Sequence, residues 1–277
     1  KFRTKNLKST NPVCVGDNVV IKITDNQTPQ IEQINGRDNY LIRKSVKLSK
    51  QYHIIASNID LCFLIITIKN PETSTMFIDR FLASTFSYNI ETVLLFNKID
   101  QINNEEKKEL NNYISIYKKA GYSCMEISGK KNINIDKLKK IMINKSCVFS
   151  GHSGVGKSTL INKLDSSIDI KTSPISESNL SGQHTTTFSE MYDLDFNSRI
   201  IDTPGIKGFG LYDVKNNELR DFFKEFTLVG NCKFNNCLHL QEPGCEVKYR
   251  VKKGDISKSR YNNYVELLSE INSNYRY

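Results

Sequence analysis

The chain has 277 residues, of which 38% are hydrophobic and 25% are charged. This composition is typical of a folded protein with one large domain or two to three small ones, and it excludes wholesale disorder. No apolar run reaches the roughly 18 residues that a membrane span needs. The seven cysteines are an odd number and mostly scattered, which favours a reducing compartment. We therefore expect a cytoplasmic protein with no membrane partner.

The net charge of +9 is concentrated at the two ends of the chain. Residues 1–50 hold ten Lys and Arg against four Asp and Glu, and residues 246–277 hold seven against four. Basic ends on a neutral middle favour an anionic partner, and nucleic acid is the first candidate. Plain solubility, or AT-rich coding that inflates Lys, Asn and Ile, would give the same excess, so charge alone leaves both explanations open.

Residues 1–50 contain short stretches of strand character separated by turns. Turn residues at Gln27–Pro29 and Asn35–Arg37 punctuate these stretches, which are Val19–Ile23, Ile31–Ile34 and Tyr40–Ile42. The pattern predicts a small β-barrel or sheet.

Apolar runs alternate with helical stretches in the next part of the chain, residues 51–212. The expected strands are Leu61–Ile68, Val93–Phe96, Ser123–Ile127, Cys147–Ser150 and Arg199–Ile201. The expected helices are Glu105–Tyr117, Ile135–Ile143 and Thr159–Leu164. This alternation predicts an α/β domain with a largely parallel sheet. Residues 213–277 are expected to form a third domain, in which helices at Asn217–Phe226 and Ser257–Asn272 flank a cysteine cluster.

Residues 151–158 carry the strongest motif. They fit the pattern G-x-x-x-x-G-K-[ST] between an apolar strand and a helix. Glycines let backbone N–H groups turn inward around phosphates, and the helix N-terminus adds partial positive charge. Lys157 can reach the β- and γ-phosphates in binding and catalysis, and the Ser158 hydroxyl can ligate Mg²⁺. The predicted phosphate-binding residues are Gly151, His152, Ser153, Gly154, Val155, Gly156, Lys157, Ser158 and Thr159.

An N-K-x-D segment, Asn97–Asp100, directs the choice of base. It follows the strand Val93–Phe96, at the strand end where ligands bind in open α/β sheets. The Asp100 carboxylate can accept hydrogen bonds from the guanine N1–H and 2-amino group, a donor pair that adenine lacks. The segment therefore predicts guanine contacts by Asn97, Lys98 and Asp100 and argues against an ATPase. Ser128 and Gly129, in a Ser-Gly-Lys tripeptide, either brace the guanine or belong to an ordinary loop.

A D-x-x-G segment follows the strand Arg199–Ile201. Asp202 can hold Mg²⁺ through water, and the Gly205 N–H can contact the γ-phosphate. Residues 182–187 read Gly-Gln-His-Thr-Thr-Thr and lie between this segment and the phosphate loop. One of these threonines can ligate Mg²⁺ only when the γ-phosphate is present, which predicts a switch; we favour Thr187 over Thr186.

Hydrolysis needs a group that orients water. Ras-like enzymes place a Gln directly after D-x-x-G, whereas this chain has Ile206, which can neither donate nor accept a hydrogen bond. Intrinsic hydrolysis is therefore expected to be slow. His184, beside the threonines, is the candidate for orienting the water, and a group supplied by a partner is the alternative.

The cysteine cluster offers three thiolates and one imidazole within fourteen residues: Cys232, Cys237, His239 and Cys245. This set matches a closed tetrahedral zinc site of structural type, which would supply folding energy to a segment with little apolar mass. A disulfide with a spare thiol, or reduced surface cysteines, are the alternatives. The basic stretch Lys248–Arg260, with Tyr249 and Tyr261 interleaved, either contacts RNA phosphates and bases or is a solvated helix face.

The order of the motifs is that of a circularly permuted GTPase. The N-K-x-D segment precedes the phosphate loop, and D-x-x-G comes last. With this order, the barrel-like start, residues 182–187 and the cysteine cluster, nearly the whole chain resembles the bacterial family of ribosome small subunit-dependent GTPase A. The resemblance implies an N-terminal OB-fold, here without its first part, a permuted GTPase domain and a C-terminal zinc domain.

The resemblance also implies a function. The family binds the small ribosomal subunit and its rRNA as a late assembly factor, and the subunit stimulates hydrolysis of GTP to GDP and phosphate. The implied cofactors are GTP or GDP with Mg²⁺ and one structural Zn²⁺, and we expect a monomer. The alternative is an rRNA-binding module whose nucleotide pocket is a passive stabiliser.

Overall fold

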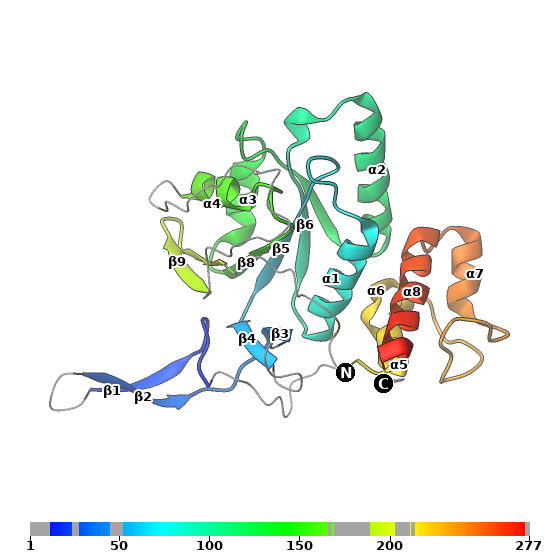
Figure 1. Cartoon of the computed structure of the whole chain (residues 1–277), viewed down its shortest axis with the longest axis horizontal. Coiled ribbons are helices and arrows are strands. Elements are labelled where there is room, and N and C mark those ends of the chain that lie inside the picture. Colours follow the sequence, from blue (N-terminus) through cyan, green and yellow to red (C-terminus); the bar gives the residue numbers. More distant parts are fainter. Residues whose placement is uncertain are drawn as a thin grey trace.

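A six-stranded sheet lies at the centre of the computed structural model (Figure 1). The structure describes residues 12–23, 28–44, 52–165, 168, 189–202, 211 and 214–274. The strand order is β7-β6-β5-β8-β10-β9. All neighbouring strands are parallel except β10 and β9. The strands are β5 (Leu61–Ile66), β6 (Thr92–Phe96), β7 (Ser123–Glu126), β8 (Ser146–Ser150), β9 (Glu190–Leu194) and β10 (Ser198–Asp202).

The central strands form where the sequence is continuously apolar. β5 and β6 are buried along their whole length, as expected for strands of a parallel sheet covered on both faces. Alternate side chains of β5 enter two different cores: Cys62, Leu64 and Ile66 enter one, and Leu61, Phe63 and Ile65 enter the other. The predicted α/β domain with a largely parallel sheet is therefore confirmed.

Helices cover both faces of this sheet. α1 (Thr75–Ser87) and α2 (Asn104–Lys119) pack in the first core, and α3 (Ile135–Met142) and α4 (Lys157–Leu164) pack in the second. The sequence predicted α2, α3 and α4 within a few residues, with α4 starting two residues earlier than expected. It did not identify α1 or the edge strand β9.

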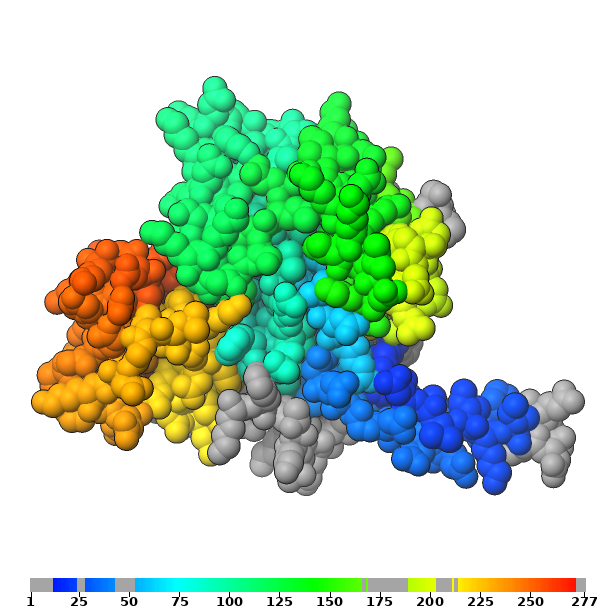
Figure 2. All heavy atoms as spheres, turned by 180° about the vertical axis from the view of Figure 1, so that it is seen from behind, coloured from blue at the N-terminus to red at the C-terminus, as the bar shows by residue number. Residues whose placement is uncertain are grey.

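The N-terminal part differs from the expected barrel. β1 (Val19–Ile23) pairs with β2 (Pro29–Ile34), and β3 (Tyr40–Lys44) pairs with β4 (Tyr52–Ser57). Within residues 12–23, 28–44 and 52–57 these are two separate two-stranded sheets, so a closed barrel is not seen there. The β1–β2 hairpin stands out from the body of the molecule, with several apolar side chains exposed (Figures 1 and 2).

The β3–β4 pair packs against the body of the molecule. Leu41, Ile42 and Ala56 are buried in the same core as α1 and α2. The pairing also crosses position 50, where the first domain boundary was expected. The positions of the domain boundaries stay predictions.

A third core holds the C-terminal elements together. They are α5 (Asn216–Leu219), a 3₁₀ turn (Arg220–Phe222), α6 (Lys224–Thr227), α7 (Glu246–Lys253) and α8 (Lys258–Asn274). The expected single helix at 217–226 is thus broken into short pieces, and α7 was not anticipated as a separate helix. Gly254, at φ 81°, ends α7 in the left-handed region and separates it from α8. Among the described residues, no helix is both long enough and apolar enough for a membrane span.

Candidate nucleotide site and candidate metal centre

The predicted phosphate loop joins the end of β8, in the middle of the sheet, to the start of α4. Gly154 and Gly156 have positive φ values of 83° and 93°. A Cβ at Gly151 would lie 2.7 Å from the carbonyl oxygen of Ile65, and one at Gly156 would lie 2.6 Å from Asn97 Nδ2. Backbone conformation and close approach therefore require glycine at these positions, and α4 begins directly at Lys157. The loop thus has the strand–loop–helix arrangement that suits an anion.

The N-K-x-D segment is hydrogen-bonded directly to the phosphate loop. Asn97 Nδ2 donates to the carbonyl of Val155 at 2.8 Å, and Asn97 Oδ1 accepts from Gly129 N at 3.2 Å. Lys98 Nζ donates to the carbonyl of Gly154 at 2.7 Å, and burial lowers the pKa of this lysine. The structure thus brings together three segments that are far apart in sequence: residues 97–100, 128–129 and 151–158.

Asp100 is oriented by the Ser-Gly-Lys tripeptide. Ser128 Oγ donates to Asp100 Oδ1 at 2.6 Å and accepts from Lys131 N at 3.0 Å. A Cβ at Gly129 would lie 3.5 Å from Leu160 Cα, so this loop also lies against α4. The contacts favour the bracing role over an ordinary loop.

Lys157, at the start of α4, forms an ion pair with Asp202, at the end of β10. Their Nζ and Oδ1 atoms lie 2.6 Å apart. Asp202 is the last residue of β10, which runs parallel to β8 beside it. The start of the D-x-x-G segment therefore lies next to the phosphate loop, as the motif requires. Ser158 and Thr159 lie in the first turn of α4.

Several predicted site residues lie outside the described residues, and the structure does not place them. They are Gly205 and Ile206 of the D-x-x-G region, and His184, Thr186 and Thr187.

One contact at the site was missed by sequence reasoning. The ring of Phe77, in the first turn of α1, lies against the ring of His152 in the phosphate loop, with centroids 3.8 Å apart and an interplanar angle of 32°. Burial lowers the pKa of His152. No sequence signal could have found this pair, because it depends on where α1 packs.

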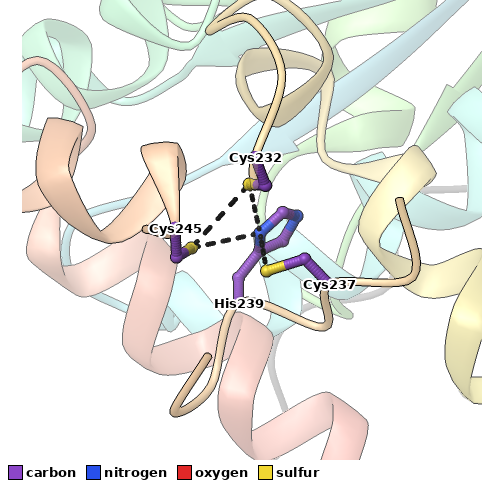
Figure 3. Close-up of side chains that lie close together, drawn as sticks. All are labelled: Cys232, Cys237, His239 and Cys245. Atoms are coloured by element: carbon purple, nitrogen blue, oxygen red, sulfur yellow. Dashed lines mark hydrogen bonds between the residues drawn. The ribbon is translucent and has the colours of Figure 1, made fainter. Parts of the chain in front are cut away.

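The four predicted metal ligands converge in the C-terminal part, with side chains directed toward one point (Figure 3). His239 Nδ1 lies 3.5 Å from the sulfurs of Cys232 and Cys237 and 3.4 Å from that of Cys245. The sulfurs of Cys232 and Cys245 lie 4.0 Å apart. A tetrahedral zinc with Zn–S of about 2.3 Å and Zn–N of about 2.0 Å places its ligand atoms about 3.5–3.8 Å apart. The residues present therefore fit a Cys₃His zinc site.

The C-terminal helices are attached to this centre. Cys245 caps α7 through Lys248 N, which donates to its sulfur at 3.5 Å. From α8, the hydroxyls of Tyr261 and Tyr264 donate to the carbonyls of His239 and Leu238, each at 2.7 Å. These hydrogen bonds connect the four ligands and their segment to α7 and α8.

The structure corrects one prediction about the basic stretch 248–260. Arg260 is 1% exposed and forms ion pairs with Asp79 and Glu225, each at 2.7 Å, so it belongs to the interior and not to an RNA-binding surface. Although burial alone would lower the pKa of Arg260, the two carboxylates hold it well above its usual value. The Tyr261 hydroxyl is likewise engaged internally. Tyr249 remains available, 48% exposed, with Lys253 Nζ 4.6 Å from its ring centroid.

The fold and the site define a class of protein. A mostly parallel sheet carries a phosphate loop, an N-K-x-D segment and the start of a D-x-x-G segment at the carboxyl ends of its strands. The order of these motifs along the chain is permuted. These features define a P-loop protein of the circularly permuted GTPase type.

Comparisons with known proteins agree with this class. The family described as RsgA GTPase matches residues 34–212. The small ribosomal subunit biogenesis GTPase RsgA of Flavobacterium johnsoniae is 52% identical over 280 residues, which cover 100% of this chain and 86% of the relative. That of Christiangramia forsetii is also 52% identical, with 100% and 89% covered. The chain therefore belongs to the RsgA GTPase family and is a GTP-hydrolysing enzyme.

Solved structures show the same fold. YjeQ from Thermotoga maritima superposes with a TM-score of 0.79 at 32% identity, covering 94% of this chain and 84% of that one. YloQ, described as a circularly permuted GTPase, gives a TM-score of 0.75 at 26% identity, covering 98% and 86%.

Proposed function

We propose that this GTP-hydrolysing enzyme acts in contact with the small ribosomal subunit, as a late factor in the maturation of that subunit. The observation that carries the proposal is the pair of hydrogen bonds made by Asn97, which joins the N-K-x-D segment to the phosphate loop and to Gly129. Base recognition and phosphate binding therefore meet at one place. The partner follows from the relatives, whose names assign them to small-subunit biogenesis.

The proposal assigns a role to each predicted site residue, beginning with those that the structure describes. Asp100, held by Ser128, accepts the guanine N1–H and 2-amino donors, with Asn97, Lys98 and Gly129 around it. The backbone of residues 151–156 surrounds the phosphates, and Lys157 stabilises charge that develops on them in the transition state.

The remaining roles concern Mg²⁺ and water. Ser158 and Asp202 would hold Mg²⁺, joined by Thr187 or Thr186 in the GTP state, and Gly205 would contact the γ-phosphate. Mg²⁺ supplies charge neutralisation at the transferred phosphate. His184, or a group from the ribosomal partner, orients the attacking water.

The domain layout and the other partners are also part of the proposal. An OB-like N-terminal part and a zinc-binding C-terminal part flank the GTPase domain, near the boundaries at 50 and 212. The Cys₃His centre holds one structural Zn²⁺, with no position open for catalysis. The exposed Tyr249 and the lysines of α7 would contact rRNA. We further propose that the protein is cytoplasmic and monomeric.

The test is GTP turnover by the zinc-loaded protein with and without purified small ribosomal subunits, at fixed moderate salt. A large stimulation by small subunits, absent with large subunits, supports the proposal. Lys157→Ala is the matched control, because it should abolish turnover while leaving subunit binding through the flanking parts. Binding without stimulation would instead favour an rRNA-binding module whose nucleotide pocket is passive.

A further inference from the structure

Helix α1 contacts the nucleotide site at its first turn. The Phe77 ring lies 3.8 Å from the ring of His152, in the phosphate loop. In the segment that leads into α1, the carbonyl of Asn70 accepts from Lys98 Nζ at 2.5 Å, the same ammonium that reaches the carbonyl of Gly154. The phosphate loop therefore contacts the first turn of α1, and the N-K-x-D segment contacts the segment that leads into it.

On the opposite side of α1, Asp79 is hydrogen-bonded to two residues of α8. Asp79 Oδ1 accepts from Arg260 at 2.7 Å and from Tyr117 Oη at 2.9 Å, and its Oδ2 accepts from Asn263 at 2.6 Å. Arg260 also makes two hydrogen bonds of 2.7 Å to Glu225 on α6. Figure 1 shows α8 beside α1. Breaking a buried ion pair carries a large penalty, so the Asp79–Arg260 contact favours a joint movement of α1 and α8.

Helix α1 lies between these two sets of contacts. Phe77 and Asp79 are two residues apart, and at 3.6 residues per turn their side chains leave the helix about 200° apart. One points to the phosphate loop and the other to Arg260. Close-packed interiors transmit small displacements, because side chains have no free volume in which to absorb them.

We propose that α1 couples the phosphate loop to the C-terminal helices, with Phe77 and His152 as positioning residues at one end and Asp79 and Arg260 at the other. The coupling rests on nucleotide binding at the proposed site, but it does not need the switch threonines. When the phosphates of a nucleotide bind to the loop, the His152 ring moves against the Phe77 ring. The resulting displacement of α1 is transmitted to α8. By linkage, a ligand of the C-terminal part whose affinity is changed by nucleotide must change nucleotide affinity by the same factor.

The experiment is amide hydrogen exchange of α8 in the full-length, zinc-loaded protein, without nucleotide, with GDP and with a non-hydrolysable GTP analogue. We expect nucleotide to slow exchange in α8 by about fivefold or more, the lower end of typical couplings. Phe77→Leu keeps an apolar side chain on α1 but removes the flat ring that meets His152. This variant should still bind nucleotide, and exchange in its α8 should no longer depend on it.

Two further variants separate coupling from loss of stability. Phe81→Leu makes the same change one turn further along α1, in the same core. The Phe81 ring lies beside that of Phe77, with centroids 6.3 Å apart, but the substitution leaves the contact between Phe77 and His152 in place, so the nucleotide effect on α8 should be kept. Asn263→Ala removes one hydrogen bond to Asp79 without leaving an unpaired buried charge, and should reduce that effect from the other end.

The outcomes are distinct. An equal nucleotide effect on α8 in wild type and Phe77→Leu would overturn the inference, and so would wild-type protein that binds nucleotide with no response in α8. Absence of nucleotide binding by wild-type protein, measured on the same samples with a fluorescent GDP, would instead refute the proposed nucleotide site.

Discussion

Replacing Gly156 by alanine tests whether the phosphate loop and the N-K-x-D segment are fitted to each other. Gly156 has φ 93°, and an added Cβ would lie 2.6 Å from Asn97 Nδ2. The left-handed conformation costs a residue with a Cβ about 1–2 kcal/mol. Displacing the Asn97 amide from the Val155 carbonyl costs about 1 kcal/mol more. The total is about 2–3 kcal/mol. If the loop of the free variant rearranges to relieve this strain, nucleotide binding must restore the strained conformation. Nucleotide affinity should then fall between about 30-fold and 150-fold.

The assay is titration with a fluorescent GDP, together with thermal unfolding of the same samples. Gly36→Ala is the matched control, because a Cβ at Gly36 would meet nothing within 4 Å. This control should change neither the nucleotide affinity nor the midpoint temperature of thermal unfolding. If Gly156→Ala bound nucleotide as tightly as wild type and unfolded at the same temperature, the proposed fit between the two segments would be wrong.

Three further predictions concern the base, the metal and pH. Asp100→Asn should shift preference from GTP to xanthosine triphosphate, because an amide can donate to the 2-carbonyl; a competition assay that shows unchanged GTP preference would contradict the assigned role. Cys237→Ser, or treatment with a strong chelator, should lower bound zinc from one equivalent to near zero and make the segment between α6 and α8 sensitive to protease; full protection without zinc would refute a structural metal. Burial raises the pKa of Asp17, but hydrogen bonds from Arg37 and Ser57 outweigh it and lower this pKa from 3.8 to about 2. The stabilisation is therefore complete above about pH 4 and is lost as pH falls toward 2. Protection of β4 from amide hydrogen exchange, taken relative to the intrinsic exchange rate at each pH, should fall across that window, and Asp17→Asn should remove this pH dependence.

The sequence predicted the central sheet because its signals are local. β5, β6 and β8 are short apolar runs. Asn97 and Lys98 interrupt the run after β6, and Gly151 interrupts it after β8, whereas the run of β5 continues to Ile68, two residues past the end of the strand. The phosphate loop and the N-K-x-D segment were predicted in the same way, from spacing and from the strands before them. The convergence of the four zinc ligands also followed from spacing, because all four lie within fourteen residues.

Other features depend on packing and could not be predicted. α1 contains four Ser and Thr residues and a buried aspartate, which weaken its helix signal. It is stabilised as a helix by apolar contacts of Ile78, Phe81 and Leu82 with the sheet. β9 carries Glu190 and Asp193 at a sheet edge, and such residues are depleted in strands. The contact of Asn97 with the phosphate loop joins residues 58 positions apart and requires the strand order.

Arg260 shows why charge counting alone cannot locate an RNA-binding surface. From sequence it is one of seven cations in residues 246–277, but in the fold it neutralises two buried carboxylates. The basic surface of the C-terminal part must therefore be sought on α7, around the exposed ring of Tyr249. Stacking of a base on an aromatic side chain contributes about 1–3 kcal/mol. Tyr249→Ala should consequently weaken binding to the small subunit between about 5-fold and 150-fold, with zinc content unchanged. Binding measured by co-sedimentation checks this, with Tyr249→Phe as the control that keeps the ring. Equal binding by wild type and Tyr249→Ala would show that α7 does not contact RNA through this ring.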